Sequence, residues 1–164
     1  MSVRGRLDEL GLTLSTAAAP VGAYVPAVRT GVHVYTSGQL PFVDGVLPVI
    51  GKVGVGPLLV DPAMATQLAR AAALNALAAV GALLARESGL EAVDALESVV
   101  RVVKVTGFVA SDGAFTGQAG VLNGASTLLH DVFGDVGVHA RSAVGVAALP
   151  LGAPVEVEIL VETR

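Results

Sequence analysis

The 164-residue sequence contains no cysteine. Without thiols the chain can form neither a disulfide framework nor a thiolate nucleophile, and it cannot build a soft thiolate metal site. This absence fits a reducing compartment, and we expect a cytoplasmic protein. The first residues read Met-Ser-Val-Arg-Gly-Arg-Leu-Asp-Glu and have no apolar run after the basic positions, so no signal peptide is predicted.

Charge is also scarce, because only 15% of the residues are charged and ten basic residues stand against fourteen acidic ones. Nucleic-acid binding needs clustered Lys and Arg that neutralise phosphates, and the basic residues here are scattered. The longest apolar run, residues 71–85, is interrupted by Asn75 and is shorter than the roughly 20 residues that span a bilayer. We therefore expect neither a nucleic acid nor a membrane as a partner.

The mean hydropathy of +0.72 is high for a chain without a predicted membrane span. Excess apolar surface on a small domain is best explained by burial between subunits. The alternative is a monomer that is simply rich in Ala and Val. A chain of this length forms one domain that can bury its own core.

No pattern of a metal site or cofactor site is present. The three histidines, His33, His130 and His139, lack the spacing of metal ligands. The Gly-rich segment 51–56 lacks the Gly-Lys-Ser/Thr ending of a phosphate-binding loop. No Ser-His-Asp order indicates a nucleophilic triad. We expect no metal and no cofactor.

Turn residues and apolar periodicity divide the chain into helices and strands. The predicted elements are, in order, a short helix at 4–10 ended by Gly11, a strand at 32–37, a hairpin turn at Asp44-Gly45, a loop at 51–57, a long helix at 64–86 capped by Asp61-Pro62, a strand at 99–109 covered on both faces, a helix at 115–133, and two strands around a break at 149–154. The order ββαβαββ predicts an α+β fold, with a single mixed sheet and two helices on one face.

Arg141 stands alone among small apolar residues in the penultimate strand. In the last strand Val and Ile alternate with Glu156, Glu158 and Glu162, so the glutamates lie opposite the core face. By elimination, Arg141 and these glutamates are predicted to share the face turned to a subunit interface. Two hypotheses follow: a structural Arg–Glu pair across the hairpin, or an Arg141 that holds a substrate carboxylate while Glu156 orients a water.

Several short motifs occur in a fixed order along the chain. They are Gly22-Ala-Tyr24-Val-Pro-Ala-Val28, Thr36-Ser-Gly-Gln-Leu-Pro41, Leu74-Asn75, Val103-Lys-Val-Thr106, Asn123, and the Arg141-Ser-x-Val-x-Val-x-x-Leu-Pro150 signature. In this order the chain resembles the reactive-intermediate deaminase (Rid) family, also called the YjgF or L-PSP endoribonuclease-like family. It resembles a longer branch, which gives an N-terminal extension at 1–19 with a short helix and a single domain at 20–164.

This resemblance implies a chorismate mutase-like fold that assembles into a barrel-like homotrimer with ligand clefts between subunits. It implies hydrolysis of 2-imino or 2-enamino acids to 2-keto acids and ammonia, without a cofactor. The residues that it implies for the site are Arg141 and Glu156 as catalytic groups and Tyr24, Ser37, Gly38, Asn123 and Arg141 as substrate-binding groups. A loop-packing role for Tyr24 and a helix-surface or capping role for Asn123 are the alternatives, and Asn75 is interpreted as structural.

The chain departs from the family pattern at two places. Ala143 stands where the deaminase branch commonly has cysteine, and Val25-Pro26 follows the tyrosine where Ser-Gln is typical. The alternative function is therefore a non-catalytic trimer that binds small carboxylates as a sensor or regulatory protein. An endoribonuclease activity is disfavoured by the acidic charge balance.

Overall fold

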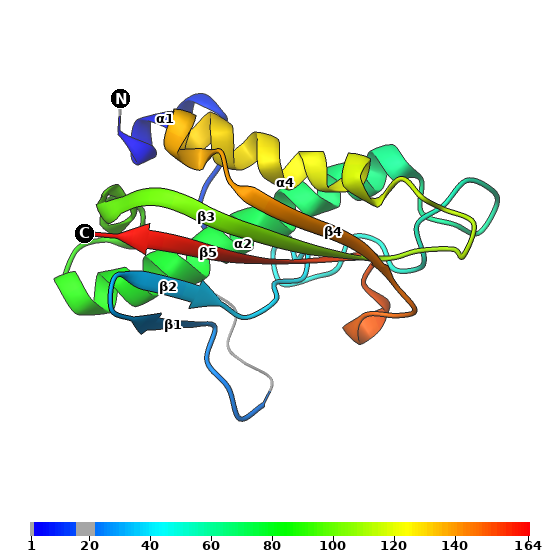
Figure 1. The fold of residues 1–164 in the computed structure, drawn as a ribbon, viewed down its shortest axis with the longest axis horizontal. Coiled ribbons are helices and arrows are strands. Elements are labelled where there is room, and N and C mark those ends of the chain that lie inside the picture. The colour runs from blue at the N-terminus through cyan, green and yellow to red at the C-terminus, as the bar shows by residue number, and fades with distance from the viewer. Residues whose placement is uncertain (1, 16–21) are drawn as a thin grey trace.

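The computed structural model describes residues 2–15 and 22–164. Its strands form one five-stranded mixed sheet in the order β1-β2-β5-β3-β4, in which only the β3–β4 pair is parallel. The strands are β1 Ala27–Thr30, β2 His33–Thr36, β3 Val99–Ala110, β4 Ala140–Val146 and β5 Val155–Thr163. The helices are α1 Val3–Glu9, α2 Pro62–Ser88, α3 Ala92–Ala95 and α4 Gln118–Phe133, with short 3₁₀ turns η1 Leu96–Ser98, η2 Gly134–Gly137 and η3 Pro150–Gly152. The predicted α+β fold with one mixed sheet is confirmed, and α2 and α4 pack together on one face of it (Figure 1).

Helix α2 begins and ends at the signals that the sequence carries. The carboxylate of Asp61 accepts hydrogen bonds from the backbone N–H groups of Ala63 at 2.8 Å and Met64 at 3.4 Å, and Pro62 occupies the first turn. Gly89 ends the helix in the left-handed conformation, at φ 76°. By length and composition α2 could cross a membrane, but 61% of its most apolar window is buried in the fold, which makes it the core helix.

Strand β5 shows how the two faces of the sheet differ. Val155, Val157, Ile159 and Val161 are buried against the helices, whereas Glu156, Glu158 and Leu160 between them are only partly buried. No helix or strand of the described residues packs on this second face, which we call the open face and which includes Tyr35, Lys104, Thr106, Phe108, Ser142, Val144, Glu156, Glu158 and Leu160. Within one chain β3 is covered on one face only, so its cover on both faces stays a prediction about the assembled protein. Its run of valines reflects strand propensity on both faces, and one face stays open within the chain.

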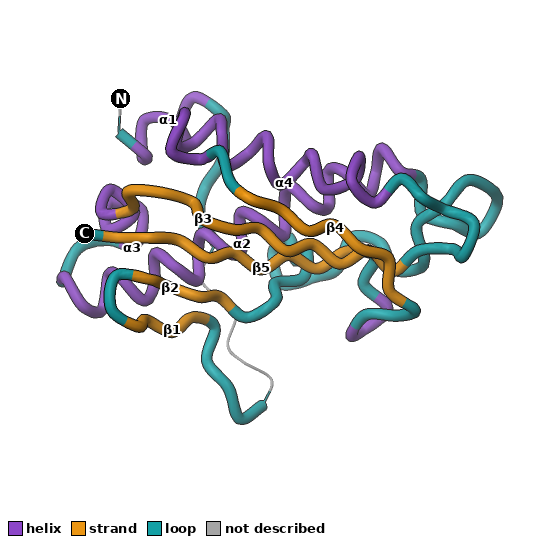
Figure 2. The backbone as a smooth tube through the Cα atoms, viewed as in Figure 1, coloured by secondary structure: helices purple, strands orange, loops and turns teal. Residues whose placement is uncertain are grey.

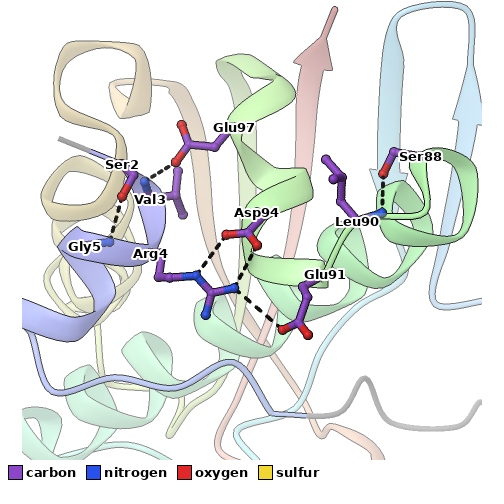
Figure 3. A network of polar contacts seen from close by, with 9 residues as sticks. All are labelled: Ser2, Val3, Arg4, Gly5, Ser88, Leu90, Glu91, Asp94 and Glu97. Carbon is purple, nitrogen blue, oxygen red and sulfur yellow. Dashed lines mark hydrogen bonds and ion pairs between the residues drawn. The ribbon is translucent and has the colours of Figure 1, made fainter.

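The N-terminal extension contains the predicted short helix, α1, followed by Gly11 at φ 65°. The helix is fastened to α3 and to the following turn, as Figure 3 shows. Both Nε and an Nη of Arg4 donate to the carboxylate of Asp94 at 2.9 Å, and the backbone N–H of Val3 donates to Glu97 Oε1 at 2.5 Å. The extension thus lies at the helix side of the sheet, and the boundary predicted after residue 19 falls outside the described residues.

The Asp44-Gly45 turn forms, but it does not make a strand pair. Val43 and Val46 exchange two backbone hydrogen bonds of 2.9 and 3.0 Å as an isolated bridge. The first hairpin is instead β1–β2, which turns at Gly31 with φ 58°. Figure 2 shows that the long connection between β2 and α2 is mostly loop, so a strong local turn signal here lacks strands to continue it.

Candidate functional site

The structure divides the predicted site residues into two groups on opposite faces of the sheet. Arg141 pairs across the sheet with Val105, which in turn pairs with Ile159, and both of these residues are in the core. Glu156 pairs with Phe108 on the open face. Residues that pair across a sheet share a face, so Arg141 points to the helix layer while Glu156 points away from it.

The prediction that Arg141 shares a face with the glutamates is therefore wrong. The prediction rested on the rule that the helix-packed face of a strand excludes a charge, and this rule holds for a central strand. Strand β4 is at the edge of the sheet, and Arg141 is only partly buried there, so its long side chain extends along α4. The carbon stem packs at the rim of the core while the guanidinium stays at the surface.

Three neutral acceptors from α4 hold the guanidinium of Arg141. One terminal nitrogen, Nη1, donates to Asn123 Oδ1 at 2.9 Å and to Ser126 Oγ at 3.0 Å. The other, Nη2, donates to the backbone carbonyl of Ala119 at 3.1 Å. No Asp or Glu among the described residues lies within 4.0 Å, so the structural Arg–Glu pair across the hairpin is also wrong for a single chain.

This arrangement leaves part of the guanidinium available. Both hydrogens of Nη1 are engaged, whereas the Nε–H and one Nη2 hydrogen of Arg141 have no acceptor in residues 2–15 and 22–164. These two nitrogens form the second edge of the planar fork. Such an edge matches the two oxygens of a carboxylate. We refer to Arg141, Asn123, Ser126, Ala119 and His139 as the arginine cluster.

His139 joins this cluster through Ser126. Its Nδ1 lies 2.6 Å from the backbone carbonyl of Gly137, which can only accept, so Nδ1 carries the proton. Its Nε2 lies 3.0 Å from Ser126 Oγ. Burial lowers the pKa of His139; the bond to Gly137 opposes this effect, and the charge of Arg141 lowers the pKa further. A neutral imidazole therefore accepts the Ser126 hydroxyl hydrogen.

The second group, which we call the glutamate cluster, consists of Glu156, Gly38 and Ser37. A Cβ built on Gly38 would lie 1.8 Å from Glu156 Oε1, so the carboxylate lies directly on the Gly38 backbone. Burial raises the pKa of Glu156, and the charge of Glu158 raises it further. A carboxylate in this setting is ready to take up a proton.

The remaining predicted residues connect this cluster to the first strands. The Ser37 hydroxyl donates to the backbone carbonyl of Val25 at 2.6 Å, which ties the segment carrying Tyr24 to the end of β2. Tyr24 itself is 52% exposed within one chain. Asn75 has the structural role expected of it, because its Nδ2 donates to the carbonyls of Leu40 at 2.9 Å and Phe42 at 3.0 Å.

Sequence reasoning missed Ser126. A lone serine in a helix gives no functional signal, although its spacing of three from Asn123 places both on the same side of α4. The spacing of His139 indicated no metal site, and the structure gives this residue two polar contacts just before β4.

Comparison with known proteins identifies the family. The model of the family described as "Endoribonuclease L-PSP" matches residues 14–163, nearly the whole chain. The chain belongs to the L-PSP family. This confirms the resemblance to the Rid and YjgF proteins found in the sequence motifs.

Similar proteins match most of the length of the chain. Protein TCP17 of Trypanosoma cruzi is 44% identical over 161 residues, which is 98% of this chain and 93% of that protein. The crystal structure of Atu1372 from Agrobacterium tumefaciens, described as of unknown function, is 44% identical with a TM-score of 0.85, covering 99% of this chain and 92% of that one. TdcF of E. coli, crystallised with bound serine, is 25% identical with a TM-score of 0.61, covering 91% of this chain and 94% of that one.

Proposed function

We propose that this L-PSP family protein hydrolyses 2-imino or 2-enamino acids to 2-keto acids and ammonia, at a site formed between the subunits of a homotrimer. Arg141 holds the substrate carboxylate and Glu156 orients the attacking water. One observation carries the proposal: an arginine fixed by neutral acceptors, with two donors left over and no carboxylate of the described chain beside it. The serine bound to TdcF supports it, since serine carries a carboxylate and a nitrogen on the same carbon, as an imino acid does.

Arg141 acts as the anchor. A carboxylate on the Nε and Nη2 edge forms charge-assisted hydrogen bonds, which contribute roughly 1.5–3 kcal/mol each. Since Asn123, Ser126 and Ala119 already hold the other edge, the guanidinium loses little freedom when the ligand binds.

Glu156 acts on the water. Its carboxylate takes a proton as the water oxygen bonds to the imine carbon, and the proton is then passed to the nitrogen. Glu156 then takes the remaining hydroxyl proton and passes it to the nitrogen, so that the carbon–nitrogen bond breaks, ammonia leaves, and the carbonyl of the keto acid forms. The burial that raises the pKa of Glu156 makes it a better base, and general-base or orienting action of this kind is worth about 10²–10⁴-fold in rate.

Two subunits are needed because the two clusters lie on opposite faces of one sheet. A substrate that touches both must lie between the arginine cluster of one copy and the glutamate cluster of the next. Such a head-to-tail contact closes into a ring, of which a trimer is a small example. The open face and the edge strand β4, which carries no Lys or Pro, are suited to that contact.

A second candidate is the non-catalytic trimer that binds small carboxylates. Ala143, beside Arg141 on β4, favours it, because its methyl group offers no polar atom where the deaminase branch commonly has cysteine. Both candidates require carboxylate binding at Arg141, and they differ only in whether the imine is turned over.

The test for turnover generates imino acids from alanine, leucine and serine with an amino acid oxidase and follows their trapping as semicarbazones. The wild-type protein should reduce trapping by hydrolysing the imine first, and Glu156→Gln should slow that hydrolysis by about 10²–10⁴-fold. The matched control is Glu162→Gln, which lies on the same face of β5 but pairs with His33 and Arg101, away from Gly38. If the wild-type protein does not accelerate hydrolysis of any of the three imino acids, the non-catalytic binding protein is favoured.

A mixing experiment tests the shared site. Arg141→Ala and Glu156→Gln should each have little activity, but co-expressed in equal amounts they should form mixed rings in which about a quarter of the sites contain both intact residues. Recovery near that level is expected, together with a trimer mass in light scattering. The two-subunit site would be overturned if the mixed protein were as inactive as each variant alone, or if light scattering gave the mass of a monomer or a dimer.

A further inference from the structure

We propose that Ser126 and His139 are positioning residues that fix the guanidinium of Arg141 for ligand binding. The proposal rests on the proposed carboxylate-binding function. Neither residue touches the ligand in it. They act through a chain of three hydrogen bonds that runs from the backbone of Gly137 to Nη1 of Arg141.

The chain of hydrogen bonds begins at a rigid point of the backbone. Gly137 is buried in η2 against the end of α4, so closely that an added Cβ would lie 2.2 Å from the carbonyl of Leu129. Its own carbonyl accepts the Nδ1–H of His139 at 2.6 Å. This bond sets both the tautomer and the direction of the imidazole ring, since a carbonyl cannot donate.

Ser126 links the fixed imidazole of His139 to the guanidinium of Arg141. A hydroxyl can rotate freely and carries one hydrogen. His139 Nε2, at 3.0 Å, accepts that hydrogen and so turns a lone pair of Ser126 Oγ toward Nη1 of Arg141, also at 3.0 Å. Without the imidazole the hydroxyl hydrogen could point at the guanidinium, and two donors would face each other.

The chain determines which edge of Arg141 meets the ligand. Ser126 and Asn123 together take both hydrogens of Nη1, and the carbonyl of Ala119 takes one hydrogen of Nη2, so the free donors are Nε–H and the other Nη2 hydrogen. The chain of hydrogen bonds brings no negative charge to the guanidinium, because every acceptor in it is neutral. Arg141 is thus oriented without being neutralised, and its charge remains for the ligand.

Calorimetric titration with 2-oxobutanoate tests the proposal. Ser126→Ala and His139→Phe should each weaken binding about three- to tenfold, the value of one net hydrogen bond. Ser126→Thr retains the hydroxyl and should bind as wild type, whereas Ser126→Val, of the same shape, should bind as Ser126→Ala. The matched control is His130→Gln, because His130 also contacts a backbone carbonyl, that of Gly134 at 3.1 Å, but has no link to Arg141.

Two results overturn the proposal. The first is that Ser126→Val and His139→Phe bind 2-oxobutanoate as tightly as wild type. This result counts even if both variants melt at a lower temperature, because the contacts would then be structural only. A second measurement needs no variant: nitrogen NMR of wild-type protein should show slow rotation of the Arg141 guanidinium, and rotation as fast as that of the exposed Arg101 would contradict a fixed fork.

The proposed function fails differently. If wild-type protein and Arg141→Ala both show no binding of 2-oxobutanoate, carboxylate binding and the positioning role fall together. If binding is lost in Arg141→Ala and unchanged in Ser126→Val and His139→Phe, the function stands and only the positioning role is wrong.

Discussion

Replacing Gly38 by alanine should remove Glu156 from its half-buried position without unfolding the protein. An added Cβ would lie 1.8 Å from Oε1, 2.6 Å from Cδ and 2.9 Å from Cγ of Glu156. Ordinary carbon contacts need about 3.5 Å, so the carboxylate has to move by roughly 1.5 Å. Because three successive atoms are too close, the end of the side chain must adopt another rotamer.

The backbone itself should tolerate alanine, since Gly38 is not among the glycines with positive φ. Alanine also restricts the unfolded chain, which stabilises by about 0.4–1 kcal/mol and offsets part of the strain. The free energy of unfolding should therefore change by no more than about 1 kcal/mol. The displaced carboxylate becomes more exposed, so its pKa should fall back toward the ordinary value of 4.5.

Carbon NMR of the Glu156 carboxyl group, followed through a pH titration, measures this pKa directly. Hydrolysis of imino acids should fall in parallel, by about 10²-fold or more, as for loss of the base. Gly113→Ala is the control, because nothing lies within 4 Å of a Cβ there. A folded Gly38→Ala protein whose Glu156 pKa stays raised would show that the glycine does not hold the carboxylate in place.

Two further predictions concern stability. Gly107→Ala should destabilise the fold by about 1–3 kcal/mol in urea unfolding, because its Cβ would lie 2.1 Å from Cδ1 of the fully buried Leu122, and an unchanged midpoint would contradict the tight packing. His139 has a lowered pKa in the folded state, so its contribution to stability is present above its ordinary value of 6.5 and is lost as pH falls below it. Melting temperatures between pH 5 and 8 should therefore decline less toward acid pH for His139→Gln than for wild type, and parallel curves would refute this reasoning.

Local signals in the sequence were sufficient for most of the fold. Asp61 and Pro62 mark the start of α2, Gly11 marks the end of α1, and the alternation of valine and glutamate in β5 separates the core face from the open face. Each of these signals works within a few residues of chain, where the helix and strand periods act. Asn75, a polar residue within an apolar helix, could likewise be interpreted as bonding the loop at Leu40.

The arrangement of the site depends on strand order, which no local pattern contains. Arg141 faces the helices because the register of β4 beside β3 pairs it with the buried Val105, and the alternation within β4 alone cannot tell which side is the core. Ser126 and His139 meet only when α4 and the start of β4 come together, 13 residues apart in the chain. The motifs could identify both clusters of site residues, but not the fact that they lie on opposite faces.

The central claim is that Arg141 binds the carboxylate of a small ligand. Calorimetric titration of wild type, Arg141→Ala and Arg141→Lys with 2-oxobutanoate tests it directly. Arg141→Ala should lose about 2–5 kcal/mol of binding free energy, as for truncation of a charge pair, and Arg141→Lys should recover only part because an ammonium has no planar fork. The melting temperature of Arg141→Ala should remain close to that of wild type, since the partners of Arg141 are neutral. An Arg141→Ala protein that binds 2-oxobutanoate with wild-type affinity would contradict the claim.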